Sequence, residues 1–120
     1  MATEQLNKYF AGYHLLMILS AVDHEFNVEE DLVIRDWLAA KCSTKENLDE
    51  HMAIISALKP EEWEQHFADC MKAYEADSTE DDRHDLVMYA AELISADKRV
   101  HENENKYVDK LFDTWFPEAG

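Results

Sequence analysis

The residues best suited to binding chemistry are four acids that recur in two similar segments of the chain. When the segment around residue 23 is laid over the segment around residue 97, Asp23 aligns with Asp97 and Glu30 with Glu104. Internal similarity of this kind is typical of a repeated structural unit. Apolar positions match as well, namely Leu19 with Leu93, Phe26 with Val100 and Ile34 with Val108.

A shared cation site follows if the two copies pack about a pseudo-twofold axis. Asp23, Glu30, Asp97 and Glu104 would then lie close together, and either protonation or a cation must relieve the repulsion among four carboxylates. Carboxylate oxygens favour hard ions. The sequence therefore predicts a divalent-cation site for Ca²⁺, Mg²⁺ or Mn²⁺ at these four residues.

Each of these acids also has a structural interpretation. Glu30 lies three residues after Asn27, and Glu104 three residues after His101, so each glutamate could complete a capping box at the start of a helix. The two aspartates follow the ends of predicted helices, where the helix dipole disfavours a carboxylate, and an Asx-turn is the competing explanation for them. His24 or His101 turning towards the acids would instead admit Zn²⁺ or Ni²⁺.

The histidines and cysteines carry no recognisable catalytic motif. None of the six histidines follows a glutamate by three positions, as paired di-iron ligands would require, and neither HExxH nor a Gly-rich phosphate loop is present. We interpret His51, His66 and His84 as lying on solvated helix faces, the last two with glutamates at i−4. Cys42 and Cys70 have no CxxC or Cys/His spacing, so we expect buried free thiols and no structural zinc site. A non-enzymatic protein is expected, and it binds a divalent cation. The alternatives are a protein-protein interaction scaffold without metal and, less favoured, a metal-dependent enzyme.

Helical periodicity predicts the elements that must position these side chains. Capping patterns and Pro60 divide the chain into about six helices. In the second helix, Leu32, Val33 and Trp37 are predicted to face inward, and the fifth helix is predicted to be the central one. The expected helices cover residues 4–22, 28–40, 43–58, 60 to the polar stretch 77–79, 79 to at least 94, and about 107–116.

These elements predict an all-α fold, with residues 1–120 forming one single-domain compact helical bundle. The internal helix-loop-helix repeat places the first two helices against the last two about the pseudo-twofold axis. The third and fourth helices would bridge the two halves.

The composition restricts the partners. The chain has 11 Lys and Arg against 27 Asp and Glu, and its net charge of −16 repels phosphate backbones and anionic lipid headgroups. The acids between residues 75 and 85 are expected to favour the start of the fifth helix rather than to bind a cation. Neither a signal peptide nor a spanning segment is recognisable, so a cytoplasmic location is expected. We expect a protein partner, no nucleic acid and no membrane insertion.

The two acidic segments resemble the signature of the tellurite-resistance TerB-like family, Ala-x-Ala-Asp-Gly-x-Ile-x-x-x-Glu in two copies. They read SAVDHEFNVEE at residues 20–30 and ISADKRVHENE at residues 94–104. The resemblance spans most of the chain. It implies an all-helical pseudo-twofold fold, a non-catalytic role in bacterial stress response or tellurite resistance, and divalent-cation binding by the paired acids. His24 and Lys98 replace the family glycine and enter left-handed loop conformations less easily, so different loop geometry is expected.

Overall fold

The computed structural model of the protein describes residues 8–21, 28–42, 47–96 and 106–116. Most of these residues lie in six α-helices. These described residues contain no strand, so the predicted all-α class is confirmed. None of their helices is both long and apolar enough to cross a membrane. The helices are α1 (Lys8–Ser20), α2 (Val28–Cys42), α3 (Asp49–Ala57), α4 (Pro60–Ala76), α5 (Glu80–Ala96) and α6 (Lys106–Trp115).

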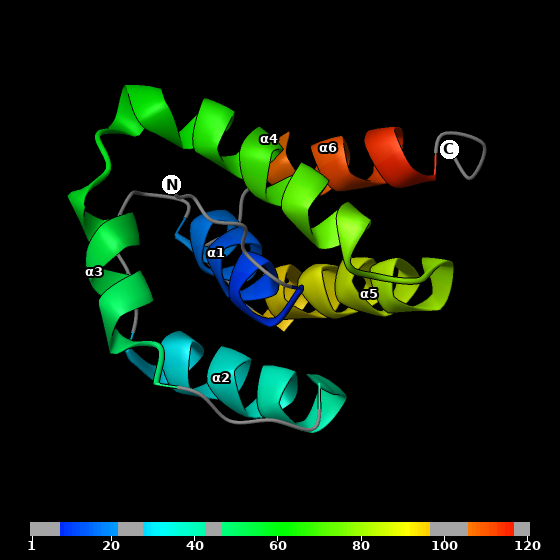
Figure 1. Ribbon diagram of the computed structural model, residues 1–120, viewed down its shortest axis with the longest axis horizontal. Coiled ribbons are helices and arrows are strands. Elements are labelled where there is room, and N and C mark those ends of the chain that lie inside the picture. The colour runs from blue at the N-terminus through cyan, green and yellow to red at the C-terminus, as the bar shows by residue number, and fades with distance from the viewer. Residues whose placement is uncertain (1–7, 22–27, 43–46, 97–105, 117–120) are drawn as a thin grey trace.

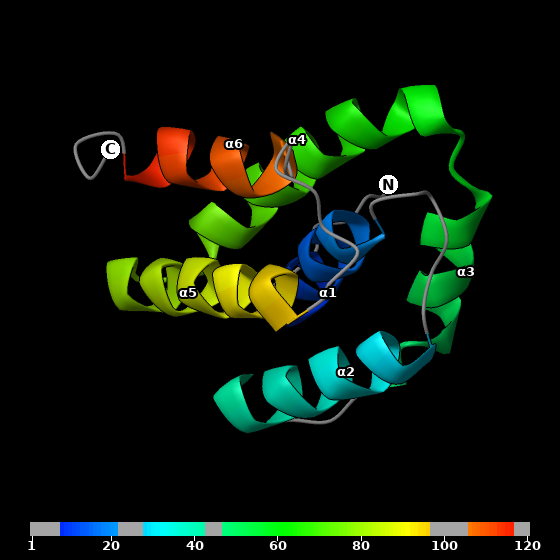
Figure 2. The same ribbon diagram turned by 180° about the vertical axis from the view of Figure 1, so that it is seen from behind.

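The central helix is α1, around which the other helices are arranged (Figures 1 and 2). Eleven of its 13 residues are buried, and its most extensive contact is with α4. The prediction that the fifth helix would be central is therefore wrong. The physical reason is charge: α1 has no charged residue after Lys8, whereas α5 begins with a run of charged side chains, each of which must be hydrated or paired.

A glycine allows close packing around α1. A Cβ atom at Gly12 would lie 3.1 Å from Cδ2 of Leu38 in α2 and 3.2 Å from Cε2 of Tyr74 in α4. Since these distances are below ordinary van der Waals contact, a Cβ atom here would require the Leu38 and Tyr74 side chains to move by a few tenths of an ångström. Gly12 thus marks the point where α2 and α4 approach the central helix.

The buried face of α2 differs from the predicted one. Leu32 and Val33 are 56% and 51% exposed, so their predicted inward orientation is wrong. Trp37 is half-buried and stacks on Tyr89 of α5, with the ring centroids 4.5 Å apart. The residues that α2 buries are Asp31, Ile34 and Leu38.

A polar network orients this face of α2. Asp31 accepts a hydrogen bond of 2.6 Å from the Tyr13 hydroxyl of α1 and one of 2.9 Å from Nε of Arg35. Arg35 also contacts Asp49 of α3 at 3.1 Å. A buried carboxylate must be paired, and these two donors allow Asp31 to turn inward although its charge alone would keep it in water.

The fourth helix agrees with its prediction. Pro60 lies in its first turn, and Glu62 Oε1 accepts a hydrogen bond from the Lys59 N–H at 2.8 Å. The preceding helix begins at Asp49, later than the predicted start at Ser43, and Asn47 Oδ1 accepts from the Asp49 N–H at 2.8 Å. The apolar side of α4 is buried as predicted, through Trp63, Phe67, Cys70, Met71 and Tyr74.

The arrangement of the two halves is partly as expected. The first helix contacts both members of the last pair, because α1 packs against α5 and α6 as well as against α2. α4 is the main partner of α1 and does more than bridge the halves. The pseudo-twofold relation stays a prediction, because the connecting segments 22–27 and 97–105 lie outside the described residues.

Candidate metal centre

The predicted acidic site lies mostly outside the described part of the chain. Asp23, Asp97 and Glu104 are not among the described residues. Glu30 is placed in the first turn of α2, where it is partly buried. A shared site for Ca²⁺, Mg²⁺ or Mn²⁺ at these four residues therefore stays a prediction.

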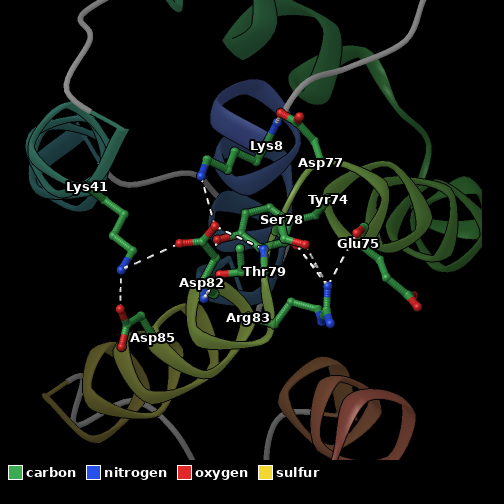
Figure 3. A network of polar contacts seen from close by, with 10 residues as sticks. All are labelled: Lys8, Lys41, Tyr74, Glu75, Asp77, Ser78, Thr79, Asp82, Arg83 and Asp85. Atoms are coloured by element: carbon green, nitrogen blue, oxygen red, sulfur yellow. Dashed lines mark hydrogen bonds and ion pairs between the residues drawn. The ribbon is translucent and has the colours of Figure 1, made fainter.

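Asp82, one of the acids at the start of α5, caps the helix, as expected. The Thr79 N–H donates to Asp82 Oδ2 and the Asp82 N–H donates to Thr79 Oγ1, both at 3.1 Å (Figure 3). Lys8 Nζ donates to Asp82 at 2.8 Å, and this bond, with that from the Thr79 backbone, holds the pKa of Asp82 below its usual value. Lys41 pairs with Asp85. This junction joins the start of α1 and the end of α2 to α5, so these charges stabilise the packing of helices.

A second cluster, which we call the His14 cluster, joins three helices around one buried imidazole. It consists of His14 of α1, His51 of α3, and His66 and Cys70 of α4. His14 Nδ1 lies 2.8 Å from His66 Nε2, and His14 Nε2 lies 2.9 Å from His51 Nδ1. Cys70 Sγ is 3.5 Å from His66 Nε2. The ring of Phe10 stacks on His51, with centroids 4.3 Å apart.

Burial keeps the imidazoles of the His14 cluster neutral. His14 is only 1% exposed, and burial, reinforced by His66 and His51, lowers its pKa to about 3. Burial also lowers the pKa of His51 and of His66. The pKa of the Cys70 thiol shifts in the opposite direction. Burial, and to a smaller extent the nearby Asp69, raises it to about 12. Neutral imidazoles offer lone pairs to a metal ion, and the thiol must lose its proton to do so.

Three ligand atoms of this cluster are close enough together to bind one transition-metal ion. The ligand atoms of His14, His66 and Cys70 all lie within 4.8 Å of one another. Tetrahedral Zn²⁺, with Zn–N about 2.0–2.1 Å and Zn–S about 2.3 Å, requires separations of about 3.3 Å between nitrogens and about 3.5 Å between nitrogen and sulfur. The His66–Cys70 distance of 3.5 Å already matches, and the two nitrogens at 2.8 Å must separate by about half an ångström.

His51 completes this arrangement as an outer partner. A metal-bound histidine usually donates its other ring N–H to an acceptor, which fixes its tautomer and orientation. With Nδ1 of His14 on the ion, its Nε2–H would point at His51 Nδ1, 2.9 Å away. Two imidazoles and a thiolate select Zn²⁺ or a similar transition metal over Ca²⁺ or Mg²⁺, which prefer oxygen.

The prediction for His66 is wrong. It was expected on a solvated face with Glu62, yet its ring turns to His14 and Cys70. His51 likewise contacts His14, whereas His84 is exposed as predicted. The cysteine spacing predicted buried free thiols and no structural zinc site, and it gave no indication that Cys70 lies beside two histidines. The sequence holds one usable signal, because the spacing of His66 and Cys70 places both on one face of α4. Nothing local indicates His14.

The chain matches no family model, no curated protein and no solved structure. Its resemblance to the TerB-like family stays a prediction from residues 20–30 and 94–104.

Proposed function

We propose that this protein is a non-enzymatic module that binds a transition-metal ion, Zn²⁺ in the first instance, through His14, His66 and Cys70. The observation that carries this proposal is the convergence of three metal-ligating atoms at the contact between α1 and α4. His14 and Cys70 are almost fully shielded from solvent. Three protein ligands leave the fourth position of a tetrahedral ion to water or another donor. The non-enzymatic role therefore rests on this burial, which hinders the access of a substrate to the ion.

A TerB-like role in stress response or tellurite resistance is the biological setting that we propose for this module. It is supported by the sequence pattern at residues 20–30 and 94–104. The hard-cation site at Asp23, Glu30, Asp97 and Glu104 belongs to the same proposal and is distinct from the His14 cluster. Cys42 and Cys70 are both free thiols, which fits a cytoplasmic location.

Zinc titration of the purified protein by calorimetry tests the metal site. We expect the wild type to bind one Zn²⁺ per chain and to release the Cys70 thiol proton on binding. Cys70→Ala should weaken binding by more than the roughly 10–100-fold that loss of an outer partner causes, because a ligand itself is removed. Cys42→Ala is the matched control, since this thiol lies outside the His14 cluster, and it should bind as the wild type does.

The outcomes separate the two sites. No zinc binding by the wild type, or equal binding by Cys70→Ala, would contradict the proposal. Titration with Ca²⁺ and Mn²⁺ reports on the acidic site, where binding should be lost in the double variant Asp23→Asn, Asp97→Asn and should be unaffected by Cys70→Ala.

We propose a basic protein surface as the partner. The net charge of −16 attracts such a surface and repels polyanions. We therefore expect no retention on immobilised heparin or duplex DNA at about 0.15 M ionic strength. Retention of the folded protein on either matrix, with release by added salt, would contradict this expectation. It would mean that a local positive surface binds the polyanion despite the negative net charge.

A further inference from the structure

The imidazoles of the His14 cluster can share their protons in two ways. A neutral imidazole has one N–H and one lone pair. His14 either donates from Nε2 to His51 and accepts at Nδ1 from His66, or donates from Nδ1 to His66 and accepts at Nε2 from His51. Both arrangements satisfy the contacts at 2.8 and 2.9 Å. These two distances by themselves are compatible with either arrangement.

A metal ion removes this choice. An ion on Nδ1 of His14 occupies that lone pair, so the proton of His14 must lie on Nε2 and His51 must accept at Nδ1. The positive charge of the ion also makes the Nε2–H a stronger donor, as in other charge-assisted hydrogen bonds. Metal loading therefore sets the tautomer of His51 and strengthens its bond to His14.

This hydrogen bond is the buried polar contact that attaches α3 to the bundle. The helix has nine residues and lies at one end of the molecule between α2 and α4 (Figures 1 and 2). Its apolar attachment is small: Ile55 and the preceding Leu48 are buried, and Met52 packs against the core. A helix this short is marginal without tertiary contacts. Its ion pair with Arg35 is made by Asp49, whose side chain is 77% exposed, and such a pair contributes little. His51, by contrast, reaches the buried His14 and stacks on Phe10.

We infer that His51 is a positioning residue through which metal loading tightens the docking of α3 on α1. This inference rests on the proposed metal site and adds its regulation: α3 is the element whose attachment reports whether the ion is bound. A partner that contacts the exposed side of α3 could thus distinguish the loaded from the unloaded protein.

Hydrogen exchange of the α3 amides, with and without zinc, tests this coupling. In the wild type, zinc should slow exchange across α3. His51→Asn should keep this response, because its Oδ1 takes the place of the ring Nδ1. His51→Phe keeps an aromatic ring against Phe10 but has no acceptor, so zinc affinity should fall by about 10–100-fold. At saturating zinc, α3 of this variant should exchange as in the unloaded protein.

A second measurement needs no variant. The ¹⁵N resonances of the His51 imidazole distinguish a protonated from an unprotonated ring nitrogen, and zinc should leave Nδ1 unprotonated and Nε2 protonated. Asp49→Asn is the matched control on α3, since it removes the ion pair with Arg35 and should preserve the zinc response.

Each outcome bears on one proposal or on both. If the wild type binds no zinc, the metal site and this coupling are both overturned. If it binds zinc while exchange of α3 and the His51 resonances stay unchanged, only the coupling is overturned. Equal zinc affinity and equal protection of α3 in His51→Phe and in the wild type would have the same meaning.

Discussion

Replacing Leu38 by alanine is expected to lower the free energy of unfolding by about 2–5 kcal/mol. Leu38 is 1% exposed and approaches the α1 backbone at Gly12, so its truncation leaves a cavity at the contact of α2 with the central helix. The same replacement at Leu32, which lies on the exposed side of α2, is expected to change the free energy by less than about 0.5 kcal/mol. Urea unfolding followed by circular dichroism measures both.

The pair of variants is matched in residue type and in helix. Both change leucine to alanine inside α2, so the change in intrinsic helix propensity is the same and only burial differs. A larger loss at Leu32 than at Leu38 would mean that α2 buries the face proposed from its sequence, with Leu32 and Val33 inward, and would contradict the described packing.

Acidification from pH 8 to pH 5 is expected to destabilise the metal-free protein by about 2 kcal/mol through His14 alone. The pKa of His14 is about 3 in the folded state against an ordinary value of 6.5, so the unfolded chain binds the proton first as the pH falls. The stability due to neutral His14 is complete above pH 6.5 and is lost progressively between pH 6.5 and pH 3. The lowered pKa values of His51 and His66 add loss in the same direction.

Urea unfolding at a series of pH values in EDTA measures this dependence without bound metal. His14→Gln should flatten the dependence between pH 8 and pH 5, whatever its effect on stability at neutral pH. His84→Gln is the matched control, because it replaces an exposed histidine outside the His14 cluster in the same way. The carboxylate of Asp82 interferes little, since its lowered pKa confines its effect to pH values below about 3.8. An equal dependence in His14→Gln and in the wild type would contradict the assignment to His14.

Several local features of the fold could be predicted from the sequence because neighbouring residues determine them. The all-helical class follows from apolar periodicity, and the buried side of α4 follows from the spacing of its aromatic residues. Pro60 marks a helix start since its missing N–H is not needed there. Thr79 and Asp82 form the expected reciprocal cap because both groups lie within one turn.

The orientation of α2 and the central place of α1 depended on residues that are distant in the sequence. One residue of rotation turns a helix by about 100°, and several faces of α2 carry apolar side chains. The face that is buried contains the acid Asp31, which becomes acceptable only because Tyr13 of α1 and Arg35 supply hydrogen bonds. Periodicity alone treats such an acid as exposed, and so it favoured Leu32 and Val33.

The sequence by itself determined that the chain is helical and acidic, and it placed His66 and Cys70 one turn apart on one face of α4, because helical geometry and charge are local or additive properties. Only the tertiary structure decided that this pair could become a metal centre. His14 has no ligand-like neighbour in its own helix, and it reaches His66 because α1 packs against α4. His51 joins because α3 carries it back to α1. A buried site assembled from three helices is a property of their packing, and no spacing within a single helix encodes it.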